Sequence, residues 1–382
     1  MKYCTKCLQP DTRPNEKFSI EGTCSACVKK YSNTNFEWRY KEKLLKSLVS
    51  NIRKKTKLSG EFNKKYDCLI GVSGGKDSTR QALWVREKLG LNPLLICLTY
   101  PPEQVTERGV YNTSNLVDLD FDLIVSGPAP ETWKLLMRTA FLNFGNWCRS
   151  TELALYSSVP QIAQKFKIPY IFIGENQNFR DPLTQTEDGW KYNQLINQNT
   201  LQGGDISWIL REGLKESEII PYIYPLNCEY MKNEVQIIDL GWFIKDWSNI
   251  ENSKFASLHG ISIRNDASDH IGDILKTSAL DENFVVVNQM IKYLKYGFGK
   301  VSDQVNEDIR NGKMDRQTGI DLITKFDGKC SAVIIDEFIN YLGISDLQFT
   351  NTLNKFVNPD LFIFTESGEF KPKFEVGSGI IK

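Results

Sequence analysis

The sequence has little histidine, no excess of either charge and no long apolar run, and each absence excludes a class of protein. Only two histidines occur in 382 residues, and Lys plus Arg equals Asp plus Glu at 47 each. Proteins that bind nucleic acid usually carry a basic excess that neutralises phosphates, so the neutral balance disfavours that role. No stretch approaches the roughly 18 apolar residues that cross a bilayer. The opening "MKYCTKCLQP" lacks the apolar segment of a secretory signal, and we expect a cytoplasmic protein without membrane contact.

Four of the nine cysteines form two C-x-x-C pairs at the start of the chain. Cys4 and Cys7 make the first pair, Cys24 and Cys27 the second, and residues 8–23 lie between them. This spacing is typical of a structural zinc site in which all four ligands are protein and no position is open to substrate. The pattern predicts bound Zn²⁺, and four unrelated thiols are the alternative.

The pattern of apolar residues divides the chain into four regions. Residues 1–35 read as a zinc ribbon and residues 36–60 as a charged helical linker. In residues 61–225 short apolar runs alternate with longer amphipathic ones, which predicts an α/β fold with a parallel sheet and crossover helices. Residues 226–382 repeat serine or aspartate starts and glycine stops, which predicts a mostly helical region for substrate or partner binding.

A glycine-rich loop, "SGGKDS" at residues 73–78, follows the first expected strand. It matches neither the Walker A loop nor the dinucleotide fingerprint. Its glycines allow backbone N–H groups to curl around an anion, and the helix that follows directs its positive end to the same place. Ser73 and Ser78 add hydroxyl donors and Lys76 a positive charge. The motif predicts a phosphate site, and a glycine turn with Asp77 as the helix cap is the alternative.

The loop and its position resemble the PP-loop of ATP pyrophosphatases, which have a Rossmann-like, HUP-type parallel sheet. These enzymes cleave ATP between the α- and β-phosphates and adenylate an acceptor oxygen, and a nucleophile then displaces AMP. The resemblance implies that Lys76 and Asp77 act in catalysis, with Asp77 also suited to Mg²⁺. It implies nucleotide contacts from Ser73, Gly74, Gly75, Lys76, Asp77 and Ser78, and from Gly174, Glu175 and Asn176 in "GEN" at the end of a later strand.

A wider set of motifs resembles the N-acetyl sugar amidotransferases of the WbpG and PseA type. The set comprises "MKYCTKCLQPDTRP", "GTCSAC", "SGGKDS", "GEN" and "KYLKYGFGKVSDQVNEDIRNGKMDR". The resemblance implies an ATP-dependent conversion of an acetamido group on an activated N-acetyl sugar into an acetamidino group. The implied pathways build surface polysaccharide, such as lipopolysaccharide O-antigen, or pseudaminic acid.

The sequence has no motif for releasing ammonia from glutamine. Such chemistry needs a cysteine nucleophile with a histidine base, or an N-terminal cysteine, but position 2 is Lys2 and the two histidines, His259 and His270, lie far down the chain. We therefore expect ammonia from another protein. The resemblance implies separate glutaminase and cyclase-like subunits related to the histidine-pathway pair.

Three further residues are candidates for substrate binding. Arg149 has a fork suited to phosphate or carboxylate, and an ordinary surface arginine is the alternative. Lys295 and Lys300 flank the glycine-broken loop "YGFG", which is either a clamp on an anionic sugar or a helix end terminated by Gly297.

Two other functions remain open from the sequence. The main alternative is a PP-loop enzyme that adenylates a tRNA base before thiolation or amination, although Cys148 lacks the C-x-x-C partner of that chemistry. A zinc-ribbon scaffold with a decayed nucleotide site is the third reading.

Overall fold

The computed structural model describes residues 1–32, 35–56, 65–174, 190–192, 200–225, 228–366 and 368–381. Its centre is a six-stranded sheet in the order β3-β2-β1-β4-β6-β5. All neighbouring strands are parallel except β5, which runs antiparallel to β6. The strands are β1 Cys68–Val72, β2 Pro93–Leu98, β3 Leu123–Ser126, β4 Tyr170–Ile173, β5 Lys191–Tyr192 and β6 Gln236–Asp239.

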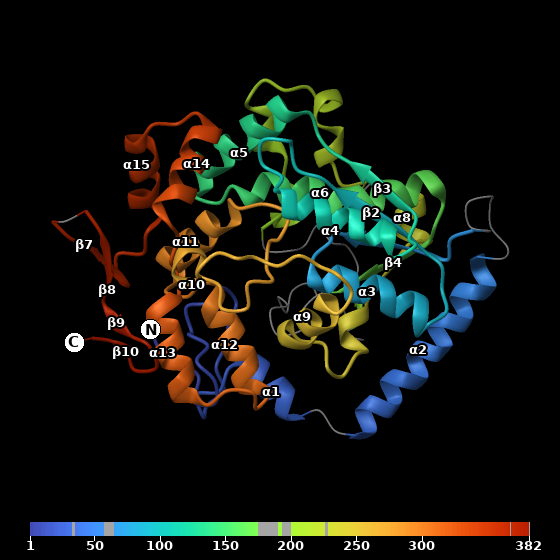
Figure 1. The fold of residues 1–382 in the computed structure, drawn as a ribbon, viewed down its shortest axis with the longest axis horizontal. Coiled ribbons are helices and arrows are strands. Elements are labelled where there is room, and N and C mark those ends of the chain that lie inside the picture. The colour runs from blue at the N-terminus through green and yellow to red at the C-terminus, as the bar shows by residue number, and fades with distance from the viewer. Residues whose placement is uncertain are drawn as a thin grey trace.

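Helices cover both faces of this sheet (Figure 1). Alternate residues of β1 enter two different cores, as the period of a strand requires. Ile70 packs in a core with side chains of α2, α3 and α4, whereas Leu69 packs with Val159 and Ala163 of α6. The helices are α1 Ser25–Ser32, α2 Asn35–Thr56, α3 Lys76–Glu87, α4 Glu107–Asp118, α5 Pro130–Phe144, α6 Cys148–Phe166, α7 Ser207–Leu210, α8 Glu229–Asn233 and α9 Asn249–Ser257.

The C-terminal part of the chain is mainly helical, with two short hairpins. The helices are α10 Ser268–Ile271, α11 Val285–Tyr296, α12 Lys300–Arg310, α13 Arg316–Phe326, α14 Ala332–Leu342 and α15 Asp346–Phe356. The hairpin strands are β7 Phe362–Phe364, β8 Phe370–Pro372, β9 Phe374–Glu375 and β10 Gly379–Ile380. The helix starts follow the expected chemistry, since Asp315, Ser331 and Ser345 each accept a backbone N–H from the first turn.

The first and last parts of the chain lie together. In Figure 1 the N-terminal segment lies beside α12 and α13, close to the C-terminal hairpin. Leu8 is fully buried in a small core with Val301, Val305 and Ile323. The N-terminal residues are therefore packed against a segment that follows about 300 positions later.

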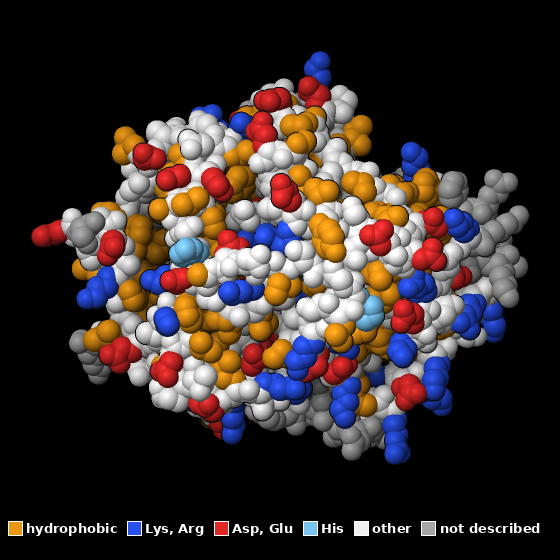
Figure 2. Space-filling model, in the orientation of Figure 1, with side chains coloured by type: hydrophobic (Ala, Val, Ile, Leu, Met, Phe, Trp, Pro, Cys, Tyr) orange, Lys and Arg blue, Asp and Glu red, His pale blue; other side chains and the backbone are white. Residues whose placement is uncertain are grey.

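The α/β fold expected from the sequence is confirmed, with a four-cysteine cluster at its start and a helical C-terminal region. The sheet extends past residue 225, the boundary expected for the α/β region, because β6 pairs with β4 and lies between β4 and β5. No described helix is long and apolar enough to cross a membrane. Charged side chains of both signs are interspersed on the face drawn in Figure 2.

Candidate functional site

The glycine-rich loop, residues 73–78, runs from the end of β1 into the first turn of α3 at the carboxyl edge of the sheet. Gly75 is the N-cap residue and the helix starts at Lys76. Gly74 has φ +73°, and a Cβ there would lie 2.7 Å from the backbone carbon of Asn112 in α4. A side chain at this position would therefore face both an unfavourable backbone conformation and the neighbouring helix.

Asp77 does not cap α3, since the helix has no side-chain cap bond. Its carboxylate accepts hydrogen bonds from Lys76 Nζ at 2.7 Å and from Asn252 Nδ2 at 2.6 Å. Arg80 donates to Asn252 Oδ1 at 2.6 Å and to Asp246 at 2.8 Å. Helix α9, which carries Asn252, thus fixes the orientation of the loop carboxylate.

The charge of Asp77 is stabilised by these partners. Burial raises the pKa of its carboxyl, but the Lys76 charge and hydrogen bond, the Asn252 bond and the Lys300 charge outweigh burial and hold the pKa below its usual value. Its side chain is 42% exposed, whereas that of Lys76 is 6% exposed. The site therefore presents an ionised carboxylate beside the buried Lys76 side chain, and a carboxylate is a usual ligand of Mg²⁺.

A cavity of about 390 Å³ lies over the loop. Its wall combines the loop and α3 with residues of α6, the ends of β1 and β4, the segment 277–281 and Lys300 at the start of α12. Gly174 closes the end of β4, where a Cβ would lie 2.7 Å from the ring of Trp247 and 2.9 Å from Gln81 Oε1. The cavity therefore forms where strand ends meet the C-terminal region, the usual place for ligands in parallel sheets.

Two buried polar atoms in the cavity wall have no hydrogen-bond partner among the described residues. They are Gln81 Nε2, on a side chain that is 2% exposed, and Ser278 Oγ. Buried polar groups are normally paired, so these two atoms are exceptions beside the cavity. A smaller cavity of about 140 Å³ shares Ser278, Ala279 and Lys300 with the first, and the Oε1 atom of Gln289 in its wall is also without a described partner.

An acidic pair stands at the edge of the larger cavity. Burial raises the pKa of Asp281, which lines the cavity, to about 6. Burial and then the Asp281 charge raise the pKa of Glu282 to about 7. Glu282 is 1% exposed and accepts the backbone N–H groups of Phe284 and Val285, so it anchors the start of α11.

The sequence-predicted residues separate into two groups. The structure brings Ser73, Gly75, Lys76, Asp77, Ser78, Gly174 and Lys300 to the wall of the larger cavity. Gly74 lies in the same loop against α4. Glu175 and Asn176 lie outside the described residues.

Arg149 and Lys295 contact other parts of the chain. Arg149 is 7% exposed, with its guanidinium 3.9 Å from the ring centre of Phe144. Lys295 donates to the carbonyl groups of Phe144 and Gly145 at 2.7 and 2.9 Å and so closes the end of α5. Gly297 has φ +74° and ends α11, as the helix-end reading of "YGFG" expects.

The histidines and Cys148 are not in the described wall of the cavity. His259 stacks on Phe255 with ring centres 4.2 Å apart, and its Nδ1 lies 2.7 Å from the Phe255 carbonyl oxygen. Burial raises the pKa of Cys148 well above its usual value. A buried neutral thiol is a poor nucleophile.

The four N-terminal cysteines form one buried cluster whose sulfur atoms all lie within 4.8 Å of one another. The Sγ atoms of Cys7 and Cys24 are 3.7 Å apart, and a tetrahedron with Zn–S bonds of about 2.3 Å places its sulfurs about 3.8 Å apart. Backbone N–H groups of Lys6 and Cys24 point at Cys4 Sγ, at 3.4 and 3.3 Å. The donor set therefore fits a tetrahedral metal ion.

The cysteine cluster is attached to α12 and α13. Asn306 Oδ1 accepts the Leu8 N–H at 2.7 Å. Arg310 Nη1 lies 3.5 Å from Cys7 Sγ, and Arg316 donates to the Cys4 carbonyl at 2.9 Å and also to the Cys7 carbonyl. The cluster therefore holds α12, which begins at Lys300, and its cysteines do not line the cavity.

Several residues of the site were not predicted from the sequence. Gln81 stands one helical turn after Asp77, so the i, i+4 spacing on α3 was a usable signal. Asn252, Ser278 and Asp281 lie far from the loop in the chain and belong to no motif. Only the fold brings them to it.

The site and fold define an α/β protein with a glycine-rich loop of the kind that binds anions and a four-cysteine cluster of the kind that binds metal ions. Residues 278–373 match the family described as "LPS biosynthesis protein WbpG-like, C-terminal domain". These residues are therefore similar to a WbpG-like C-terminal domain, which supports the WbpG-type resemblance drawn from the motifs.

Two other comparisons add little to this assignment. No match was found among curated proteins. Among solved structures the chain is similar to the U34-tRNA thiolase NcsA from Methanococcus maripaludis with its [4Fe-4S] cluster, at 16% identity over 82% of this chain and 87% of that chain. The TM-score is 0.31, which is too low to establish a shared fold.

Proposed function

We propose that the chain is an ATP-dependent amidotransferase that converts the acetamido group of an activated N-acetyl sugar into an acetamidino group. The pathway would be surface polysaccharide synthesis, such as lipopolysaccharide O-antigen, or pseudaminic-acid synthesis. One observation carries the proposal: the WbpG-like domain supplies Ser278, Ala279, Leu280, Asp281 and Lys300 to the wall of the cavity over the "SGGKDS" loop. The family-specific part of the chain and the anion loop thus share one cavity.

The loop is the place for the triphosphate of ATP. Lys76 and the N-terminus of α3 would neutralise the departing pyrophosphate, and the Ser73 and Ser78 hydroxyls would donate to its oxygens. Asp77 would hold Mg²⁺, which supplies additional positive charge against the phosphates. Asn252 and Arg80 act as positioning residues because they orient the Asp77 carboxylate.

The acceptor would lie on the side of Lys300 and Ser278, toward the smaller cavity. The acetamido oxygen attacks the α-phosphorus, the bond to the β-phosphate oxygen breaks, and pyrophosphate leaves with an O-adenylated imidate behind. Ammonia then adds to the imidate carbon and AMP leaves with the former amide oxygen. The nitrogen of ammonia stays on the carbon in place of that oxygen. Lys300 would stabilise negative charge between the two cavities.

Ammonia would come from separate glutaminase and cyclase-like subunits. This proposal follows from the sequence, in which no cysteine–histidine glutaminase motif occurs. A buried structural zinc, rather than a catalytic one, would occupy the four-cysteine cluster.

Product analysis tests the proposal. The purified chain is incubated with ATP, a pool of UDP- and CMP-linked N-acetyl sugars and concentrated ammonium, and we expect AMP, pyrophosphate and a sugar lighter by about one mass unit, because NH replaces O. Lys76→Ala should abolish all three products, whereas Lys46→Ala, at an exposed position on α2, should not. ADP and phosphate as products would refute the assignment, and AMP formed only with tRNA present would favour the base-modifying alternative.

A further inference from the structure

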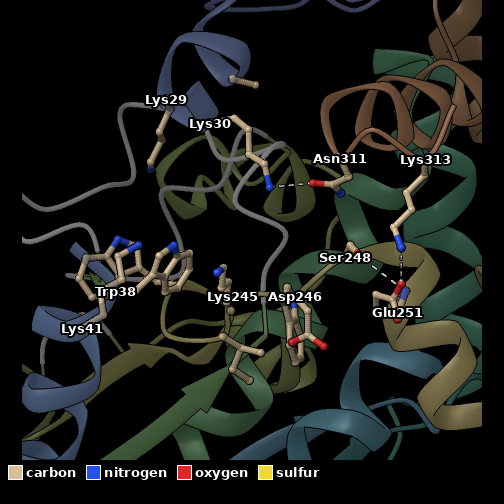
Figure 3. A pocket seen from close by; sticks show the side chains of 15 residues that line it. Lys29, Lys30, Trp38, Lys41, Lys245, Asp246, Ser248, Glu251, Asn311 and Lys313 are labelled. Carbon is tan, nitrogen blue, oxygen red and sulfur yellow. Dashed lines mark hydrogen bonds and ion pairs between the residues drawn. The ribbon is translucent and has the colours of Figure 1, made fainter. Parts of the chain in front are cut away.

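A second pocket, of about 260 Å³, lies between the N-terminal helices and the segment that leads into α9. Figure 3 shows its labelled side chains approaching from α1, α2, the segment 241–248, α9 and the end of α12. None of its described lining residues lines the cavity over the loop. The pocket is therefore a separate site.

The pocket has an excess of positive charge. Five lysines line it against two acids, namely Lys29, Lys30, Lys41, Lys245 and Lys313 against Asp246 and Glu251. Both acids are already engaged: Asp246 binds Arg80 at 2.8 Å, and Glu251 binds Lys313 at 3.2 Å. Lys41 pairs with Glu37 at 3.6 Å. None of the ion pairs among the described residues involves Lys30 or Lys245, so these two lysines carry the positive charge that a ligand can meet.

The lysines repel one another across the pocket. Partial burial lowers the pKa of Lys30, the Glu307 charge opposes this, and Arg310 and Lys245 lower it further. Burial likewise lowers the pKa of Lys41, which is 4% exposed, with Glu37 opposing and Lys29 lowering it further. A bound anion would relieve this repulsion, since opposite charge favours the charged form of each lysine.

Aromatic rings form another part of the wall. Trp38, Trp242 and Trp247 line the pocket, and Lys41 Nζ lies 4.4 and 4.1 Å from the ring centres of Trp38 and Trp242. Trp38 is partly exposed, whereas the other two rings are buried. An indole face beside ammonium groups suits a planar ring that carries phosphate groups, because the ring stacks while the phosphates pair with the cations.

We propose that this lysine–tryptophan pocket binds a nucleoside diphosphate, either free or as the nucleotide part of a larger molecule. Lys30 and Lys245 account for the diphosphate and the partly exposed Trp38 for the base. Inorganic phosphate would use the lysines alone and leave the aromatic wall without a role. The proposal does not depend on the chemistry at the loop.

The pocket is linked to the loop by three successive hydrogen bonds. Asp246 in the pocket binds Arg80, Arg80 binds Asn252, and Asn252 binds Asp77. Trp247 also contacts the position where Gly174 ends β4. Occupancy of the pocket is thus positioned to influence the loop, and binding must be measured separately from turnover.

The test is a titration of the full zinc-loaded chain with UDP, followed by tryptophan fluorescence and by calorimetry, in the absence of ATP. We expect saturable quenching that persists in Lys76→Ala, where the loop is impaired. Lys245→Glu should weaken UDP binding by about tenfold or more, the usual effect of losing a charge-assisted contact, while Lys46→Glu, an equal charge change at an exposed site on α2 outside the pocket, should not. Lys245 is exposed, so its replacement leaves the core intact.

Trp38→Ala provides the second variant. It should weaken UDP binding more than pyrophosphate binding and so remove the preference of the wild type for UDP. UDP binding that disappears in Lys76→Ala but survives Lys245→Glu would overturn the proposal, since the loop would then be the only site. Pyrophosphate binding as tightly as UDP, or an RNA oligonucleotide displacing UDP at lower concentration, would also overturn it in favour of a simple anion site or a nucleic-acid surface.

Discussion

Gly74→Ala measures how far the loop depends on close contact with α4. At φ +73° an alanine has an unfavourable backbone conformation, which costs about 1–2 kcal/mol. Its Cβ would also lie 2.7 Å from the Asn112 carbon and 2.8 Å from the Thr113 nitrogen, and such overpacking typically costs about 1–3 kcal/mol more. The sum, about 2–5 kcal/mol, is a large part of the stability of an ordinary domain, about 5–15 kcal/mol.

Gly312→Ala is the matched control. Gly312 has φ +67° but nothing within 4 Å of an added Cβ, so it bears only the backbone cost. Thermal unfolding should therefore show a lower midpoint for Gly74→Ala than for Gly312→Ala. Titration with ATP should show weaker binding only in Gly74→Ala, because the loop must move away from α4.

Equal melting midpoints for the two variants would refute this reasoning. They would mean that the loop and α4 separate without cost, and that backbone conformation alone explains the glycine. Unchanged ATP affinity in Gly74→Ala would contradict the placement of the triphosphate on this loop.

Three further predictions concern single residues and the metal. Lys300→Gln should lower kcat/KM by about tenfold or more with little change in the melting midpoint. Lys295→Gln should lower the melting midpoint and leave kcat/KM unchanged, because Lys295 binds two carbonyls at the end of α5. The opposite pattern for the two variants would contradict the placement of Lys300 in the site. The pKa of Glu282 rises on folding from 4.5 to about 7, so the protonated acid stabilises the fold and that stability is lost as pH increases over this range. The melting midpoint of Glu282→Gln minus that of the wild type should thus increase between pH 5 and pH 8. A constant difference would refute the raised pKa of Glu282 in the folded protein. Elemental analysis should find about one zinc per chain, and its removal by a strong chelator should lower the melting midpoint and weaken ATP binding; metal-free protein with both properties intact would refute a structural role for the cysteine cluster.

Local patterns in the sequence predicted the parts of the fold that depend on neighbours in the chain. The alternation of strand and helix lengths led to the parallel sheet, and serine or aspartate starts located helices such as α13 and α15. β6, Gln236–Asp239, was not predicted from the sequence, although β3 and β4 are equally short. Its place in the sheet follows from pairing with β4.

The contrast between Lys295 and Lys300 shows how little of the site the local sequence can predict. Both lysines flank one glycine-broken loop, and nothing in the local sequence distinguishes them. Gly297 ends α11 and the chain changes direction, so Lys300 faces the cavity while Lys295 turns to α5. Asn252 shows the same limit, because its contact with Asp77 spans 175 positions.

The attachment of the cysteine cluster to α12 sets an order of events during synthesis. Residues 4–27 leave the ribosome long before Asn306, Arg310 and Arg316, which bind the backbone or sulfur of that cluster. Translation at about 5–20 residues per second separates the two segments by about 15–60 seconds. Through that interval the N-terminal segment has neither α12 nor α13 to pack against, so its four cysteines can meet a metal ion before the segment docks.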